Sequence, residues 1–309
     1  MRKTYCLLLL VGVLLFSGCG WQVAPSMSAQ AVTFTDDLGR TVTVDQPKRV
    51  AALLGSFAQI WMLAGGDVVA TVDDAWEDLG LPLEADTVNL GGTENLSLEL
   101  LLEAQPDFIL ASPNRRQNVE WMETLEASGI PVAYFDVANF QDYLRMLQIC
   151  TQITGREDLY AQHGTAVQQQ IDGVLERRQG QASPKVLCLV ASASYLKPKN
   201  SDANVLGAML RDMGCINIAD SDRALQDGLS LEHILLSDPE YIFIVQRGDD
   251  PEGMRAYVDR FIAENPAWNQ LQAVKNGKVY YMDKTLFNLK PNHRWGEAYE
   301  ILEEILKNG

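Results

Sequence analysis

The hydrophobic and polar positions of the first half of the chain predict strands that alternate with helices. Residues 32–44 alternate around Asp37-Leu38-Gly39-Arg40, which predicts a β-hairpin. Short apolar runs predict further strands at residues 49–54, 68–72, 108–111 and 131–135. Helices are expected at residues 56–64, 98–104 and 119–128. Because most links are short, this order predicts a parallel sheet that is covered by helices on both faces.

The second half of the chain repeats this order. Strands are expected at residues 185–191, 241–245 and 278–282, and helices at residues 204–213, 231–236 and 295–307, with a further helix that ends at 261–265. Between the halves, residues 157–178 keep apolar positions on one helical face. A helix of that length spans about 33 Å, enough for a rigid strut between two lobes, although a long surface helix inside one domain gives the same pattern. We predict an α/β fold with two Rossmann-like lobes, each with a central parallel sheet, joined by this single helix, with a ligand cleft between the lobes.

The first residues have the pattern of an export signal. Arg2 and Lys3 precede an apolar run, and Ser17-Gly18-Cys19 follows it. That run is shorter than the roughly 20 residues that span a bilayer. It resembles a bacterial lipoprotein signal in which Cys19 becomes lipidated, and the alternative is an ordinary secretory signal with an incidental Cys. The next stretch is small, polar and aperiodic, which is typical of a tether.

These patterns divide the chain into five expected segments. They are the signal peptide (residues 1–18), the lipid-anchored tether (19–31), the N-terminal lobe (32–156), the interlobe helix (157–179) and the C-terminal lobe (180–309). The mature protein is expected to be a body held at the outer surface of the cell membrane.

One phrase occurs in both lobes. Residues 97–109 read SLELLLEAQPDFI and residues 230–242 read SLEHILLSDPEYI, 133 positions apart (230 − 97). In each copy a Ser can cap a short helix, a Glu lies in its first turn, and a Pro ends it before an apolar strand. Helix–Pro–strand units are common in α/β proteins, but so many matched positions favour two lobes of like architecture, each presenting one Glu at an equivalent place.

Composition excludes several classes of protein. The net charge of −16, which becomes −18 when Arg2 and Lys3 leave with the signal, argues against nucleic acid as a partner, because phosphates require clustered Lys and Arg. Cys150, Cys188 and Cys215 remain in the mature chain without CxxC spacing, so neither a disulfide framework nor a zinc site is expected.

A family resemblance rests on four parts of the chain. They are DDLGRTVTVDQPKRVAAL (residues 36–53), the repeated phrase, NQLQAVKNGKVYYM (269–282) and NLKPNHRWGEAY (288–299). Together they resemble the substrate-binding lipoproteins of bacterial ABC importers for siderophores, cobalamin and haem. The resemblance implies a monomer without enzymatic activity or resident cofactor. A protein of this family is expected to capture a small-molecule ligand, here an iron–siderophore-type complex, and to deliver it to a permease dimer with its ATPase.

The resemblance also gives the repeated Glu a role. In that family an acidic residue on each lobe tip engages arginines of the permease, and Glu99 and Glu232 match those positions here. One carboxylate on each lobe suits a dimeric basic partner, since rim charges set orientation and encounter rate. The alternative is that each Glu only favours its helix macrodipole, by about 0.3–1 kcal/mol.

The ligand is expected between the lobes, at the carboxyl ends of the parallel strands. The expected contacts follow those strands: Ser56, Phe57, Asp74, Trp76, Asn114, Arg115 and Arg116 in the first lobe, and Ser192, Tyr195, Gln246, Arg247, Phe287, Asn288 and Arg294 in the second. The arginines can form bidentate bonds to carboxylates, and the aromatic rings can stack on a flat chelate or macrocycle. For any single Arg the alternative is a surface ion pair, and Trp295 is expected in the core.

The sequence leaves the identity of the ligand open. His163, His233 and His293 are not clustered with carboxylates, so a receptor for a bare metal ion is not expected. A haem often takes an axial His, Met or Tyr, and His293 or Tyr195 would be available. The arginines favour a ferric siderophore with anionic groups, and a haem or cobalamin receptor of the same family is the alternative.

Two further classes of function are less favoured. The chain contains no G-x-S-x-G, H-E-x-x-H, G-x-G-x-x-G or phosphate-loop motif, so an enzyme is not expected. A surface hydrolase would have to assemble its site from separated residues such as Asp73, Asp74 and His293. A ligand sensor without a transporter would not need the repeated Glu.

Overall fold

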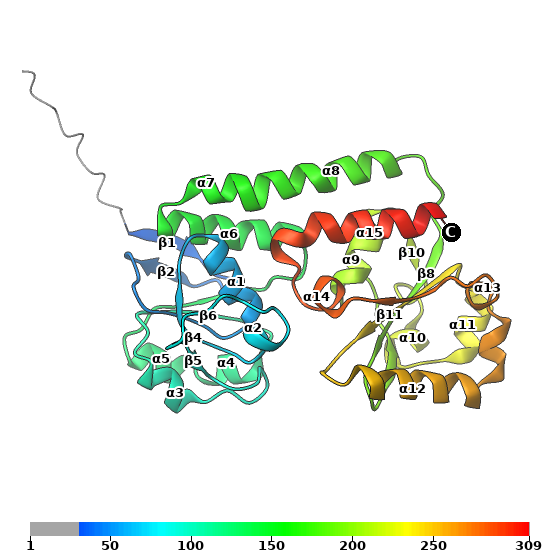
Figure 1. Cartoon of the computed structure of the whole chain (residues 1–309), viewed down its shortest axis with the longest axis horizontal. Coiled ribbons are helices and arrows are strands. Elements are labelled where there is room, and N and C mark those ends of the chain that lie inside the picture. The colour runs from blue at the N-terminus through cyan, green and yellow to red at the C-terminus, as the bar shows by residue number, and fades with distance from the viewer. Residues whose placement is uncertain (1–30, 309) are drawn as a thin grey trace, which may run out of the picture.

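The computed structural model describes residues 31–308 of the 309-residue chain. The expected signal peptide, the Cys19 lipidation site and the tether up to residue 30 lie outside the described residues. Figure 1 shows two lobes side by side, bridged along one edge by helices. No helix within residues 31–308 has the length and apolarity needed to cross a membrane. The predicted two-lobed α/β fold is confirmed.

The first lobe begins with the predicted hairpin, in which β1 (Val32–Thr35) pairs antiparallel with β2 (Thr41–Val44). Its sheet is parallel throughout, with strand order β5-β4-β3-β6-β7. The strands are β3 (Val50–Ala52), β4 (Val68–Thr71), β5 (Val88–Asn89), β6 (Phe108–Ala111) and β7 (Val132–Tyr134). The helices are α1 (Gly55–Leu63), α2 (Asp74–Glu77), α3 (Leu98–Glu103), α4 (Arg116–Glu120), α5 (Met122–Ala127) and α6 (Phe140–Thr154). The helix expected at residues 119–128 is thus two short helices that meet at Trp121.

The second lobe contains a mixed sheet. Strands β10-β8-β11-β12 are parallel in that order, and β9 pairs antiparallel with β8. The strands are β8 (Lys185–Ala191), β9 (Leu196–Pro198), β10 (Ile216–Asn217), β11 (Tyr241–Gln246) and β12 (Val279–Met282). The helices are α9 (Val205–Asp212), α10 (Arg223–Asp227), α11 (Leu231–Ser237), α12 (Pro251–Glu264), α13 (Gln272–Lys275), α14 (Lys284–Phe287) and α15 (Trp295–Asn308), with 3-10 turns η2 (Pro266–Gln270) and η3 (Asn292–Arg294). The predicted parallel sheet is thus present over four strands, and β9 adds an antiparallel strand that folds back on the strand that precedes it.

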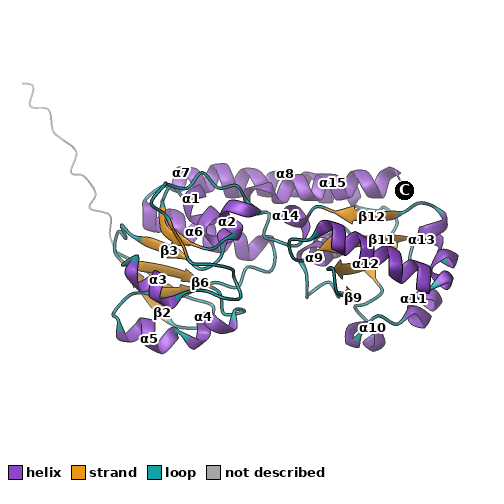
Figure 2. Ribbon diagram, turned by 60° about the horizontal axis from the view of Figure 1, so that its bottom comes forward, coloured by secondary structure: helices purple, strands orange, loops and turns teal. Residues whose placement is uncertain are grey.

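The helix expected between the lobes is present over Glu157–Arg178. It consists of α7 (Glu157–Tyr160), a π turn η1 (Ala161–Thr165) and α8 (Ala166–Arg178). It does not stand alone, because α15 lies beside α8 in both views (Figures 1 and 2). The Arg177 guanidinium on α8 bonds the Glu303 carboxylate on α15 at 2.7 Å. The strut between the lobes is therefore a pair of helices that are far apart in the sequence.

The apolar core follows this arrangement. Each lobe has a separate cluster on one face of its sheet. On the opposite faces, a single continuous cluster includes residues of both sheets together with α6, α8 and α15. Burial of apolar side chains therefore binds both lobes to the strut, since the free energy scales with the area removed from water.

The repeated phrase builds the same helix end in each lobe. α3 and α11 are each followed by a residue with a left-handed backbone and then a Pro. These residues are Gln105 (φ 47°) and Asp238 (φ 41°), and each lies eight positions after the Ser of its copy (105 − 97 and 238 − 230). The caps differ, because the Ser97 hydroxyl accepts a bond from the Leu100 N–H, whereas Ser230 makes no such bond.

The acidic residue after each Pro also has the same structural role. The Asp107 carboxylate accepts a bond from the Arg49 N–H at 2.8 Å, just before β3. The Glu240 carboxylate accepts a bond from the Lys185 N–H at 3.0 Å, at the start of β8. Most of the repeat is thus explained by the fold. Within the described part of the chain, the exposed Glu99 and Glu232 side chains form no such internal bond.

Candidate functional site

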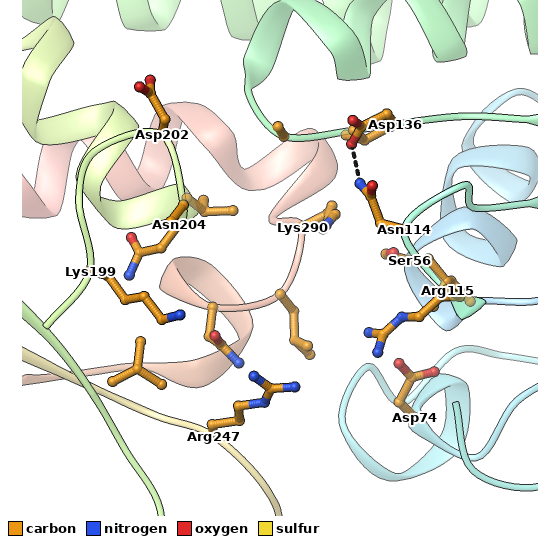
Figure 3. A pocket seen from close by; sticks show the side chains of 18 of the residues that line it. Ser56, Asp74, Asn114, Arg115, Asp136, Lys199, Asp202, Asn204, Arg247 and Lys290 are labelled. Carbon is orange, nitrogen blue, oxygen red and sulfur yellow. Dashed lines mark hydrogen bonds between the residues drawn. The ribbon is translucent and has the colours of Figure 1, made fainter. Parts of the chain in front are cut away.

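A cavity of about 420 Å³ lies between the lobes and is lined by residues of both. Ser56 follows β3 and Arg115 follows β6, while Arg247 follows β11, so loops at the carboxyl ends of both sheets meet there. Figure 3 shows the polar side chains of the two lobes facing one another across this space. The expected position of the cleft therefore agrees with the structure.

Six of the expected contacts line this cavity. They are Ser56, Asp74, Asn114, Arg115, Arg247 and Asn288. All but Asn114 and Arg247 are at least partly buried, and all belong to loops or to the first turn of a helix. Polar side chains dominate this set, with hydroxyl, amide, carboxylate and guanidinium groups.

None of the four expected aromatic contacts lines the cavity. Phe57 is fully buried and packs edge-on against Phe135, and Phe287 is 1% exposed. Both belong to short helices that follow a strand, and their rings pack into the core. Trp76 and Tyr195 are partly buried outside the cavity, and the Lys197 ammonium lies over the Tyr195 ring. A stacking platform built from these rings is therefore not present in the cleft.

Two of the four expected arginines form ion pairs elsewhere. Arg116, whose side chain is 91% exposed, pairs with Glu120 one turn along α4. Arg294 pairs with Glu297 at 2.7 Å. Both arginines therefore form the surface ion pair that was the alternative to a ligand contact.

The remaining two expected contacts bond within their own loops. The Ser192 and Ser194 hydroxyls lie 3.2 Å apart, and the Gln246 amide donates to the Gly248 carbonyl. Neither residue lines the cavity. Trp295 is buried against Phe140, as expected for a core residue.

The cavity also includes residues that the sequence did not point to. They are Asp136, Lys199, Asp202, Asn204 and Lys290, among others. Lys199 follows β9, which has only three residues and ends in a Pro, so no strand pattern marks it. Lys290 precedes Pro291, in a segment whose apolar positions follow neither a helical nor a strand pattern. In the sequence, the one indication that these lysines line the cavity is their positive charge close to other expected contacts.

The segment that carries Lys290 runs from the second lobe back to the first. We call residues 288–294 the crossing segment. The amide of Asn292 donates to the Ser56 carbonyl at 2.9 Å and to the Gln59 side chain at 2.8 Å. Asn292 is fully buried and has a left-handed backbone (φ 54°). These bonds fix the crossing segment on α1, so its lysine has a defined position in the cleft.

The carboxylates that line the cavity already have partners. Asp136 accepts a bond from the Asn114 amide at 2.6 Å, and Asp202 pairs with Arg211. Asp74 accepts a bond from the Gly55 N–H at 3.0 Å. A Cβ on Gly55 would lie 2.3 Å from the Asp74 carboxylate, so this approach requires glycine. Burial raises the pKa of Asp74 to about 6, against the opposing effect of this bond.

Fewer of the cations that line the cavity have an acidic partner within the protein. Arg115 pairs with the exposed Glu94. Within residues 31–308, the side chains of Lys199, Arg247 and Lys290 form no ion pair. Burial, and secondarily the Arg115 charge, lowers the pKa of Lys290, while Asp136 and Asp142 oppose this effect. The cleft therefore holds more free positive than free negative charge.

Two helices also begin at the cavity. Leu54 and Ser56 at the start of α1 line it, and the N-cap of α1 makes no side-chain bond. Asn204 and Val205 at the start of α9 line it from the other lobe, and the Asn204 Nδ2 is buried without a partner. The positive ends of the helix dipoles therefore add to the charge of the side chains, an arrangement that favours anionic oxygens.

A neighbouring cavity of about 380 Å³ shares Asp74, Arg115 and Arg247 with the first. At its edge the Lys284 ammonium bonds Asp78 of the first lobe at 2.8 Å and Asp249 of the second at 2.5 Å. Among the ion pairs of the described residues, this is the one that joins the two lobes directly.

The histidines lie outside the cavity between the lobes. The rings of His163 in η1 and His293 in η3 meet edge to face with centroids 6.0 Å apart, and burial lowers the pKa of both. His233 bonds Asp222 at 2.7 Å on the surface of the second lobe. Over the described range, no group of three or more His, Cys, Asp or Glu residues is placed to hold a metal ion.

Comparisons with known proteins agree with this architecture. A family model described as periplasmic binding protein matches residues 47–286, which include every strand of both sheets. The Fe(3+)-citrate-binding protein YfmC of Bacillus subtilis is 27% identical over 290 residues, covering 89% of this chain and 87% of that protein. The putative ABC transporter substrate-binding lipoprotein YhfQ of the same organism is 24% identical, covering 99% of this chain and 98% of that protein. A solved ABC transporter substrate-binding protein from Listeria monocytogenes has the same fold, with a TM-score of 0.71 at 18% identity over 86% of this chain and 100% of that chain.

Proposed function

Because the chain belongs to the periplasmic binding protein family, we propose that it is the extracytoplasmic substrate-binding component of an ABC importer for a ferric siderophore-type complex. The observation that carries this proposal is the cavity between the lobes, which is lined by cations of both and by two helix starts. The relative YfmC, whose name states that it binds Fe(3+)-citrate, supports the same class of ligand.

The cavity lining favours a polar chelate over a macrocycle. Among the described residues that line it, none is aromatic and none is a His, Met or Cys. A haem therefore lacks its usual axial ligands there, and neither a porphyrin nor a corrin ring has an aromatic side chain on which to stack. The site binds and releases its ligand, and we assign it no catalytic step.

We propose that Glu99 and Glu232 dock the protein on its permease. They lie on α3 and α11, one on each lobe, away from the edge that carries α8 and α15 (Figure 1). Both are exposed, and the fold explains the Pro and the second acidic position of the repeat but not these two. Their role is to orient the complex through charge, with the cleft between them.

The replacement of both Glu99 and Glu232 by Ala tests the docking role. We expect ligand affinity to stay unchanged, because neither residue lines the cavity, while ligand-stimulated ATPase activity of the transporter falls to its basal rate. Matched controls are Glu103→Ala on α3 and Glu252→Ala on α12. ATPase activity of the double variant equal to that of the unaltered protein would rule out this docking role.

We further propose that Cys19 anchors the protein by lipidation, so that it acts at the outer face of the cell membrane. The sequence pattern around Cys19 supports this, as does the name of the relative YhfQ, a substrate-binding lipoprotein. Mass spectrometry of the protein from membranes would detect the acyl chains on Cys19.

A ligand panel tests the transport function. The full chain, processed by the cell and purified in detergent, is titrated with ferric citrate, ferrichrome, a ferric catecholate, haemin and cyanocobalamin while its tryptophan fluorescence is recorded. We expect saturable binding of at least one ferric chelate and none of haemin or cyanocobalamin. Binding of haemin or cyanocobalamin alone would overturn the proposed ligand class.

A further inference from the structure

We propose that the cleft selects a polyanionic ferric chelate over a neutral one, and that Lys290 is the residue that determines this selectivity. This rests on the proposed function, since it narrows the class of chelate that the same cavity binds. The argument depends on which charges in the cavity already have partners.

The cavity contains four cations and three carboxylates. Of the carboxylates, Asp202 pairs with Arg211, while Asp74 and Asp136 accept hydrogen bonds from neutral groups and have no cationic partner. Of the cations, only Arg115 has an acidic partner, and that partner is exposed. Three cations without an acidic partner thus outnumber two such carboxylates, so an anionic ligand would balance the excess positive charge, whereas a neutral chelate would bury it uncompensated, which is costly.

The unpaired cations belong to separate parts of the molecule. Lys199 follows β9 and Arg247 follows β11 in the second lobe, and Lys290 lies on the crossing segment (Figure 3). They thus approach the cavity from different directions. Several anionic groups spread around one metal centre suit cations that come from separate elements better than a single carboxylate does.

Lys290 has a special position among these cations. Two residues after it, Asn292 is fixed to α1 by bonds to Ser56 and Gln59, so the crossing segment holds Lys290 against the first lobe. Ser56 itself lines the cavity. Burial lowers the pKa of the Lys290 amine, and a bound anion is the group that would stabilise its charged form. Arg247, by contrast, is exposed to solvent.

The size and surface of the cavity agree with such a ligand. A volume of about 420 Å³ fits a compact chelate. The beginning of α9 supplies further positive potential, whereas the beginning of α1 already faces the Asp74 carboxylate, and the buried Asn204 Nδ2 is a donor without a partner. Carboxylate and phenolate oxygens accept from such donors, and a neutral hydroxamate carries less charge for them to bind.

The test compares two ferric probes with three variants in the full, naturally processed protein. The probes are ferric citrate, which is polyanionic, and ferrichrome, which is neutral. The variants are Lys290→Met, Lys290→Arg and the control Lys197→Met, whose ammonium lies over Tyr195 outside the cavity. Affinity is measured by tryptophan fluorescence, and thermal unfolding confirms that each variant is folded.

We expect the unaltered protein to bind ferric citrate more tightly than ferrichrome. Lys290→Met should weaken ferric citrate binding by at least about tenfold and leave ferrichrome binding unchanged, since one charge-assisted contact of this kind is worth that factor. Lys290→Arg should keep most of the affinity, and Lys197→Met all of it. If Lys290→Met does not fold, Lys290→Gln, which removes the charge but keeps a polar side chain, provides the same comparison.

Two results would overturn the inference. One is tighter binding of ferrichrome than of ferric citrate by the unaltered protein, which would leave the proposed transport of ferric chelates intact. The other is an equal loss of affinity for both probes in Lys290→Met, which would show that Lys290 has only a structural role. Absence of binding to either probe and to the catecholate would instead contradict the proposed function itself.

Discussion

At the scale of single residues, Asp74 shows how burial in the cleft changes the protonation of a carboxylate. Its carboxylate is partly buried at the junction of two cavities, beside a glycine that must lack a side chain. Burial outweighs both the Gly55 hydrogen bond and the neighbouring cations, so the pKa of Asp74 is raised to about 6. The carboxyl therefore gains a proton in the mildly acidic range, and the cavity becomes more positive when it does.

This raised pKa predicts a pH-dependent stability. Between its ordinary pKa near 3.8 and about 6, Asp74 is protonated in the folded protein and ionised in the unfolded chain, so the free energy of unfolding falls as pH rises through this window. We expect Asp74→Asn to remove this slope and to raise stability at pH 7 by about 1–3 kcal/mol. Thermal unfolding of both proteins at pH 4.5 and pH 7 measures it. An unchanged slope in the Asn variant would show that another group titrates.

The residues of the cleft also show what the sequence could and could not predict. Ser56, Arg115 and Arg247 follow strands of a parallel sheet, and this rule alone places them correctly. Phe57 and Phe287 follow strands as well, but the helical turn that begins there directs their rings into the core. Lys290 follows no strand closely, and its position results from contacts between residues more than 230 positions apart, namely Asn292 with Ser56.

At the scale of elements, the strands and helices were predictable where the local pattern alone decides them. The expected strands at residues 108–111 and 185–191 agree with β6 and β8 residue for residue. The three-residue β9 has no alternation to reveal it and exists because it pairs with β8. The helix expected at 119–128 divides at Trp121, which a pattern of apolar positions cannot foresee.

Local patterns in the sequence also do not predict that α8 packs against α15. Glu303 on α15 is nearly buried and bonds both Arg177 on α8 and Lys307 one turn further on. The Arg177 hydrogen bond is the main cause that lowers the pKa of Glu303, to about 2. The two helices are thus joined by charge as well as by apolar contact.

The Glu303 contact predicts a second pH effect, with the opposite sign. Because the pKa of Glu303 is lowered, its contribution to stability is present above its ordinary pKa near 4.5 and is lost as pH falls towards 2. We expect Glu303→Gln to destabilise the protein by about 1 kcal/mol at pH 7, since Arg177 is half exposed and solvent weakens the pair. Chemical denaturation at pH 7 and pH 3 measures the difference, with the exposed Glu304→Gln as control. A deficit of the same size at both pH values would contradict this account.

At the scale of the whole molecule, the relation between the lobes is set by two kinds of contact. On the strut side a continuous apolar core joins both lobes to α8 and α15. On the cleft side the direct link is polar, through Lys284 to Asp78 and Asp249. The first resists separation of the lobes, and the second is the ion pair that any opening of the cleft would have to break.

The Lys284 bridge predicts an effect on the rate of ligand release. Its side chain is 14% exposed, and loss of the ammonium would leave Asp78 and Asp249 facing each other without a cation. We expect Lys284→Met to speed dissociation of a bound ferric chelate by about three- to tenfold, with little change in the association rate. Stopped-flow fluorescence separates the two rates, and the exposed Lys275→Met is the matched control. A variant with an unchanged dissociation rate would show that the bridge does not hold the cleft closed.

The place of α15 has a consequence for the synthesis of the protein. The last fourteen residues of the described chain cover α8, which was made more than a hundred positions earlier. Until they leave the ribosome, the apolar face between the lobes has no cover and the strut is incomplete. The positions of the two lobes relative to each other are therefore fixed only when α15 packs on α8, after both sheets have been made.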